Sequence, residues 1–275
     1  MPPPGYQPYP GYSPSGYPPS GYPPSGYQPY PGYPPSGYPP WQGQAPLLGP
    51  ERVRGNRIAA AFVQIGLAAA AVLQFIVISA VLHQRQVLHD FVDGTAGFPE
   101  VDGADHSLKQ AQDVLIVVVL ITATLFVIWL WRLRKDAGVF HPGLQRMGQP
   151  WVIAGWIIPF ANLVIPYLVV SDVAAASVGG PPGPTSWNPR RPGIVKVWWT
   201  LWVVAFVGNR ILSATNPDSV EGFDTYTAWE IGFALLATVT AIVAIVLVEQ
   251  LTRNDAVRWS APSGPPQAPA PTHRW

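Results

Sequence analysis

Five long apolar stretches, separated by polar segments, dominate the middle of the chain. They cover residues 58–82, 114–131, 151–170, 197–212 and 231–248. A helix needs about 20 apolar residues to cross a hydrocarbon core roughly 30 Å thick, and each stretch comes close to that length. The pattern therefore predicts an all-α integral membrane protein, and hydropathy alone gives five transmembrane helices.

The positions of lysine and arginine favour a different count, because these residues collect in the cytoplasmic loops of membrane proteins. Five crossings would divide the fifteen loop residues of this kind seven to eight, which is no bias. If residues 151–170 enter and leave on the same side, thirteen share one side and only Arg85 and Lys109 lie opposite, Arg210 being intramembrane. The thirteen are Arg52, Arg54, Arg57, Arg132, Arg134, Lys135, Arg146, Arg190, Arg191, Lys196, Arg253, Arg258 and Arg274. We therefore predict four transmembrane helices, one re-entrant or interfacial broken helix, and both termini in the cytoplasm, with five transmembrane helices as the alternative.

The third stretch carries the residues that a broken helix requires. Pro159 and Pro166 interrupt the backbone hydrogen-bond ladder. Backbone groups freed at membrane depth must find partners inside the protein, and Asn162 lies between the prolines to supply them. A kinked ordinary span is the alternative for residues 151–170.

Two ionisable residues stand near the outer ends of neighbouring predicted helices. Arg210 is close to the end of the fourth stretch and Glu230 precedes the fifth, so antiparallel helices bring them to similar depth. Intramembrane charges are candidates for function, whereas charges near the interface can pair or snorkel towards water. We expect pairing or snorkelling here, with an ion or proton path as the alternative.

Small and aromatic residues indicate where helices pack and where the membrane ends. Close helix contacts are expected at one face of the last stretch and at a small pair in the first. These residues are Ala234, Ala237, Ala241 and Ala244, and Gly66 and Ala70. An aromatic belt at headgroup level is expected from tryptophans near the ends of the stretches. They are Trp129, Trp131, Trp198, Trp199 and Trp229.

The two ends of the chain have a different composition. Residues 1–46 repeat Ser-Gly-Tyr-Pro-Pro and close variants, and the last residues are also rich in proline. Such sequences have too little aliphatic surface to form a core and favour extended polyproline II structure. We predict disordered tails at 1–50 and 260–275 around a multi-pass membrane domain at 51–259. Successive tyrosines of the repeat point in different directions, which favours a spacer or many weak contacts with protein partners.

Candidate chemistry changes this picture little. Only 11% of the residues are charged and none is cysteine, so thiolate chemistry and disulfides are excluded. The sequence contains no phosphate-binding glycine loop with Lys, no zinc helix and no nucleophile elbow. His83, His89, Asp90 and Asp93 are better explained as a solvated loop than as a metal site. We expect no catalytic site, cofactor or metal, and the basic clusters beside the apolar stretches suit anionic lipid rather than nucleic acid.

Two segments carry a resemblance to a known family. FVIWLWRLRKDAG at 126–138 and WVIAGWIIPFANLVIPYLVVSDVAAAS at 151–177 resemble the actinobacterial membrane family called domain of unknown function 4328. The likeness is strongest from Gly155 to Tyr167 and extends over roughly residues 60–250. The chain departs from the family at Asp136 and Ala174, where Asn and a bulky Trp are frequent. The resemblance implies a membrane protein, and it supplies no catalytic or binding residues.

The sequence thus favours a non-enzymatic protein of the cell membrane that engages partners through its tails and loops. The alternative is a small transporter or channel that uses the broken helix at 151–170. The positions that either function would place under constraint are Gly155, Pro159, Asn162, Pro166, Arg210 and Glu230.

Overall fold

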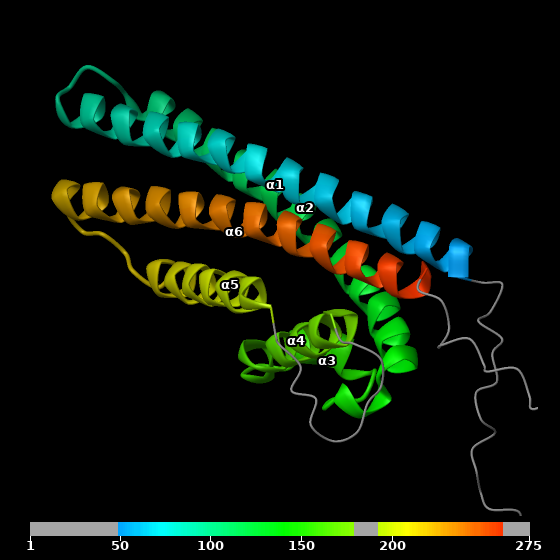
Figure 1. Ribbon diagram of the computed structural model, residues 1–275. Helices are drawn as coiled ribbons and strands as arrows, with labels where there is room; N and C mark the ends of the chain where they lie inside the picture. The colour runs from blue at the N-terminus through cyan, green and yellow to red at the C-terminus, as the bar shows by residue number, and fades with distance from the viewer. Residues whose placement is uncertain (1–48, 179–191, 261–275) are drawn as a thin grey trace, which may run out of the picture. The chain divides into compact units, whose positions relative to one another are not determined.

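The computed structural model describes residues 49–178 and 192–260, and all the regular structure within them is helical (Figure 1). The predictions for the tail residues 1–48 and 261–275 lie outside these ranges. The elements are α1 (Gly49–Val92), α2 (Phe98–Phe140), η1 (Pro142–Leu144), α3 (Trp151–Ile157), η2 (Ala161–Leu163), α4 (Ile165–Val178), α5 (Gly193–Leu212) and α6 (Val220–Ser260). The predicted all-α class is confirmed.

Helix α1 packs along both α2 and α6 and runs antiparallel to each of them (Figure 1). Each exceeds 40 residues and is therefore about 60 Å long, twice the thickness of a hydrocarbon core. Their apolar stretches are central, so each helix has polar turns at both ends, beyond the length of a hydrocarbon core. Close approach of α1 and α2 depends on Gly66, because a Cβ there would clash with the hydroxyl of Thr122.

Five helical segments are long and apolar enough to cross a membrane. They are Pro50–Val92, Phe98–Phe140, Ala161–Val178, Gly193–Leu212 and Val220–Ser260. Their apolar parts match the five predicted stretches, except that the third segment begins within its stretch rather than at residue 151. The chain is therefore suited to a membrane by the composition of its helices.

The third stretch forms a hairpin rather than one helix. It consists of α3, a turn containing η2, and α4, and the two helices pack against each other. At the turn, Phe160 has a φ of 63°, and the N–H of Ala161 donates to the carbonyl of Pro159 at 2.7 Å. This is a classic γ-turn, a rare and strained conformation. Pro166 stands in the first turn of α4, where its missing N–H removes no helical hydrogen bond.

The main apolar core lies where this hairpin packs against α2, α5 and α6. Trp129, Leu130 and Val170 are fully buried there. The aromatic belt predicted at the membrane boundary is therefore not formed by Trp129, Trp198 and Trp199, whose exposed fractions are 0, 4 and 8%. The hairpin covers these rings, and Trp156 of α3 lies within 6.3 Å of Trp199 between ring centroids.

Candidate functional site

Two buried carboxylates meet at the end of the bundle where α1 begins and α2 and α6 end. The side-chain amide of Asn56 donates to Asp136 Oδ2 at 2.7 Å and to Asp255 Oδ2 at 2.9 Å. All three side chains are buried and come from three different helices. One amide therefore joins α1, α2 and α6, and we call this group the carboxylate clamp.

Two arginines complete the clamp. Arg52 Nη1 lies 3.1 Å from Asp136 Oδ1, and Arg132 Nε donates to Asn56 Oδ1 at 2.9 Å. The amide of Asn56 is thus fixed in orientation, because its oxygen accepts from a cation and its nitrogen donates to the acids. A buried charge requires such partners, and breaking one side of a buried pair typically costs about 3–5 kcal/mol.

The clamp lies outside the membrane-spanning stretch of α6. Asp255 follows Val248, the last residue of that stretch, by seven residues, or about 10 Å along the helix. Burial raises the pKa of Asp255 from 3.8 to about 7, and the charge of Asp136 adds to this effect. The hydrogen bond from Asn56 acts in the opposite direction, lowering the same pKa.

The α3–α4 hairpin is attached at the same end of the bundle. The backbone N–H and the guanidinium of Arg146 both bond Asp172, and Arg134 Nη2 donates to the carbonyl of Met147 at 2.6 Å. Asp172 is only 3% exposed in its side chain. Nearby, Arg258 of α6 contacts Nε2 of His141 at 2.9 Å and the carbonyl of Ala176 in α4.

We call this end of the bundle the basic end, because many arginines gather here, among them Arg52, Arg132, Arg134, Arg146 and Arg258. His141, just beyond the last residue of α2, responds to that environment: burial and the charge of Arg258 lower its pKa. Glu249 and Arg253 form a further pair on the surface of α6, but it is exposed and its atoms are 3.9 Å apart. The buried contacts therefore hold the hairpin and the long helices together, and the surface pair adds little.

A second polar group lies at the opposite end of the bundle. Asp224 Oδ1 of α6 is 2.7 Å from Arg85 Nε and 2.9 Å from His89 Nε2, both on α1. Hydrogen bonds from these two groups lower the pKa of Asp224 to about 2. Asp224 precedes the membrane-spanning stretch of α6 by seven residues, so the apolar zone lies between charged groups at both ends.

The structure brings four of the six predicted positions together in the hairpin. Gly155 is buried, and a Cβ on it would lie 2.7 Å from Ile165 Cγ2, so glycine permits the close approach of α3 and α4. Pro159 is exposed in the turn and Pro166 is buried in α4. Asn162 is half-buried, and its Oδ1 has no hydrogen-bond partner among the described residues. The expectation that this oxygen would accept from a freed backbone N–H is therefore wrong.

The other two predicted positions do not meet. Glu230 accepts a hydrogen bond from Gln112 of α2 at 3.1 Å, whereas Arg210 is exposed on α5. No ion pair between them occurs in the part of the chain that is described. Gly208 of α5 lies against Phe233 of α6, so Arg210 and Glu230 are at a similar level along the two helices. Level does not fix the direction of a side chain around its helix, and Glu230 turns to Gln112 while Arg210 is exposed.

Sequence reasoning missed the carboxylate clamp and Asp172. The bonded residues of the clamp are 76 to 199 residues apart in the chain, so no local pattern joins them. One signal was available: Asp136 stands between Lys135 and an apolar run, where an isolated acid needs a cationic or amide partner if it is buried.

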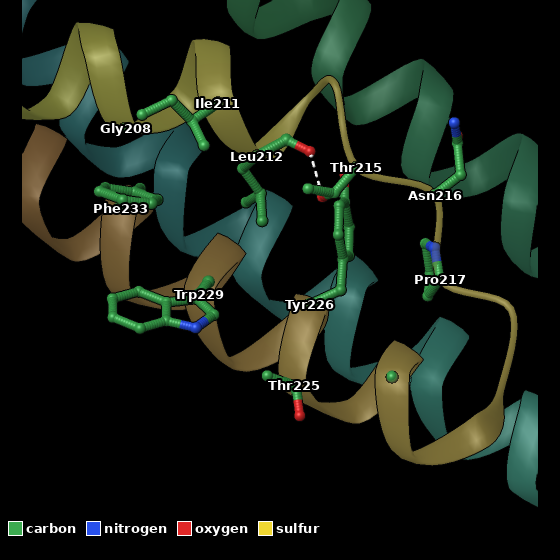
Figure 2. Close-up of a pocket in the computed structure, with 11 residues that line it drawn as sticks. Gly208, Ile211, Leu212, Thr215, Asn216, Pro217, Thr225, Tyr226, Trp229 and Phe233 are labelled. Carbon is green, nitrogen blue, oxygen red and sulfur yellow. Dashed lines mark hydrogen bonds between the residues drawn. The ribbon is translucent and has the colours of Figure 1, made fainter.

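A pocket of about 550 Å³ opens between the end of α5 and the start of α6 (Figure 2). Tyr226, Trp229 and Phe233 of α6 face Ile211 and Leu212 of α5. The hydroxyl of Thr215 donates to the carbonyl of Leu212 at 2.6 Å, which closes the end of α5. A pocket lined in this way suits an apolar or amphiphilic molecule.

The chain matches one known protein family. The sequence profile of the family described as "Domain of unknown function (DUF4328)" matches residues 93–253. No curated protein and no solved structure gives a match. The matched range covers more than half of the chain and includes α2, the hairpin, α5 and most of α6, and this chain therefore belongs to the DUF4328 family.

Proposed function

We propose that this protein is a non-enzymatic, multi-pass protein of the cell membrane that engages protein partners at its cytoplasmic face. The observation that carries this proposal is the common location of the described chain ends. Gly49 and Ser260 flank the carboxylate clamp, and Ala176, near the end of α4, contacts Arg258. The segments 1–48, 179–191 and 261–275 are thus all joined to the basic end.

The start of α5 fits the same arrangement. Gly208 of α5 packs against Phe233 of α6, and the two helices run antiparallel (Figure 1). Fifteen residues earlier, Gly193 therefore comes level with Val248, where the membrane-spanning stretch of α6 ends. The first residue of α5 accordingly lies at the basic end of the bundle.

The hairpin geometry supports four crossings rather than five. Taken alone, helices α3 and α4 have 7 and 14 residues, about 10 and 21 Å, and are shorter than a 30 Å core. The third segment reaches the length of a crossing only when η2 and the turn before α4 are counted with it. The Arg146–Asp172 pair holds the entry of the hairpin beside the second half of α4. Phe160 at the tip is 87% exposed, which is favourable in lipid and costly in water.

The distribution of charge supports a cytoplasmic basic end. Among the thirteen described Lys and Arg residues, Arg85, Lys109 and Arg210 lie towards the opposite end and the other ten lie at the basic end. Membrane proteins retain such residues in the cytoplasm. Both chain termini are then cytoplasmic, and partner contacts concentrate on that side.

Site-specific photo-crosslinking in cells tests the proposal. A photoreactive residue replaces Tyr22 or Tyr38, which lie outside the described residues, or the exposed Gly143 at the basic end. The exposed Thr95, between α1 and α2 at the opposite end, is the matched control. We expect discrete protein adducts from the first three positions. Adducts that are no more frequent there than at Thr95 would contradict the proposal.

The second candidate is a small transporter that uses the hairpin, and one observation favours it. Asn162 Oδ1 is buried without a hydrogen-bond partner among the described residues, so it could serve a solute or an ion. Protein reconstituted in liposomes should then move a solute faster than Asn162→Ala protein does. Equal flux from both proteins and from empty liposomes would eliminate this candidate.

A further inference from the structure

A second cavity, of about 550 Å³, lies beside the hairpin at membrane depth. On α2 it extends from Val119 to Ile128, which is within the apolar stretch 114–131. Helix α3 borders it with Ile153 and Ile157. Because it lies at the depth of the hydrocarbon core, its surroundings in a membrane are lipid chains.

The cavity arises from a difference in side-chain size. Trp156 of α3 and Trp198 and Trp202 of α5 form bulky walls, whereas Ala123 of α2 and Ala244 of α6 leave space beside them. The rings hold one another, since Trp156 and Trp202 meet edge to face with centroids 5.8 Å apart. The walls are thus fixed by packing, which is what a preformed binding groove requires.

The groove remains open to the membrane on the side of α2. Leu120, Ile128 and Ile157, which line it, are 62, 51 and 73% exposed. An acyl chain can therefore enter from the bilayer without any rearrangement of the helices. A water-soluble molecule would first have to cross the headgroup layer.

The same face of α2 becomes cationic towards the basic end. Residues three or four apart share a helix face, so Leu120, Thr124, Val127, Trp131 and Lys135 form one row. The Nζ of Lys135 lies 5.8 Å from the centroid of the Trp131 ring. Lys135 follows Ile128 by seven residues, or about 10 Å, the distance from acyl chain to headgroup level.

We propose that this groove binds an anionic phospholipid, with one acyl chain between α2, α3 and α5 and the headgroup phosphate at Lys135. Charge complementarity selects the anionic headgroup, and the inner leaflet supplies such lipids. The inference rests on the proposed cytoplasmic placement of the basic end. The hairpin then serves to build one wall of a lipid site.

Quenching by brominated lipids tests this proposal in the full chain, which has no cysteine of its own. Thr124→Cys places a bimane label in the groove. Val246→Cys is the matched control, because Val246 is 51% exposed on α6 and lines none of the described pockets. It also lies at similar depth, as the Asn56–Asp255, Gln64–Ile245 and Gly66–Thr122 contacts align the helices.

The labelled proteins are reconstituted with brominated phosphatidylglycerol or brominated phosphatidylcholine. At Thr124 we expect relative binding to favour the anionic lipid by about fivefold, the effect of one well-placed basic residue. At Val246 the two lipids should quench equally, because Arg253, seven residues further along α6, is paired with Glu249. Lys135→Gln should abolish the preference at Thr124, whereas Lys109→Gln, at the opposite end, should leave it unchanged.

Three other outcomes of the quenching experiment would contradict the lipid site, and one of them would also contradict the membrane placement. Equal quenching by both lipids at Thr124, or a preference that survives Lys135→Gln, overturns the lipid site while Val246 still reports membrane insertion. Absence of quenching at both positions overturns the proposed membrane placement as well. The two proposals therefore fail in distinguishable ways.

Discussion

Arg146 and Asp172 form an ion pair, with Nη2 and Oδ1 2.8 Å apart, that closes the open end of the α3–α4 hairpin. Arg146 lies five residues before α3 begins, and Asp172 lies in the second half of α4. The backbone N–H of Arg146 also donates to Asp172, at 3.1 Å. A single helix crossing the membrane could not bring these two positions together, so the pair defines the path of the third segment.

Removing Asp172 should destabilise the protein strongly. Its side chain is 3% exposed, and Asp172→Ala leaves the guanidinium and N–H of Arg146 without their acceptor. We expect the free energy of unfolding to fall by about 3 kcal/mol. Glu249→Ala is the control, because the Glu249–Arg253 pair is exposed and should contribute less than about 0.5 kcal/mol. Unfolding of purified protein in detergent measures both, and equal losses would contradict the structural role of Asp172.

Asp255 should make stability depend on pH between about 4 and 7. Burial, with the charge of Asp136, raises its pKa to about 7, whereas an unfolded carboxyl titrates near 3.9. The folded state binds more protons in this interval, so this contribution to stability is present below about pH 4 and is lost as the pH rises to 7.

Asp255→Asn should remove that contribution, because the amide does not titrate. The difference in unfolding free energy between the variant and the natural protein should therefore change from pH 4 to pH 7 and be constant above pH 8. Asp218→Asn, at an exposed position of the opposite end, should show no such change. A difference that is the same at pH 4 and pH 8 would show that Asp255 keeps an ordinary pKa.

Gly155→Ala should disturb the hairpin by contact between α3 and α4. The added Cβ lies 2.7 Å from Ile165 Cγ2, and such overpacking typically costs about 1–3 kcal/mol. Ile165→Ala removes that atom, so the double variant should lose less stability than the sum of the two single variants. At Gly232 a Cβ meets nothing within 4 Å, and Gly232→Ala should be neutral or stabilising by up to about 1 kcal/mol. Strict additivity of Gly155→Ala and Ile165→Ala would contradict the contact.

The helices and the break in the third stretch could be predicted because their causes are local. Apolar length sets α1, α2, α5 and α6. Pro159 lies at the break between α3 and α4, and Pro166 falls in the first turn of α4, so both prolines stand at helix ends in the third stretch. Gly155 could be singled out, although its partner Ile165 could not. That contact depends on the direction in which the chain returns after Phe160, which no periodicity encodes.

The side-chain partners could not be predicted, because they depend on which helix faces turn towards each other. Glu230 contacts Gln112 rather than Arg210 for this reason. The same limit applies to Trp129 and Trp198, whose position along the helix suits a membrane interface but whose rings are covered by the hairpin. The carboxylate clamp requires three helices in register, and its polar members are few in an apolar sequence.

The proposed topology of four crossings requires that the third segment return to the side of the membrane from which it came. Thr215→Cys, exposed after α5, and Thr95→Cys, exposed after α1, should both react with a membrane-impermeant thiol reagent added to intact cells. Gly143→Cys, exposed before the hairpin, should react only after the membrane is opened. A topology with four crossings predicts this pattern of labelling. Protection of Thr215→Cys together with labelling of Thr95→Cys would mean that the segment crosses the membrane, and would contradict the account.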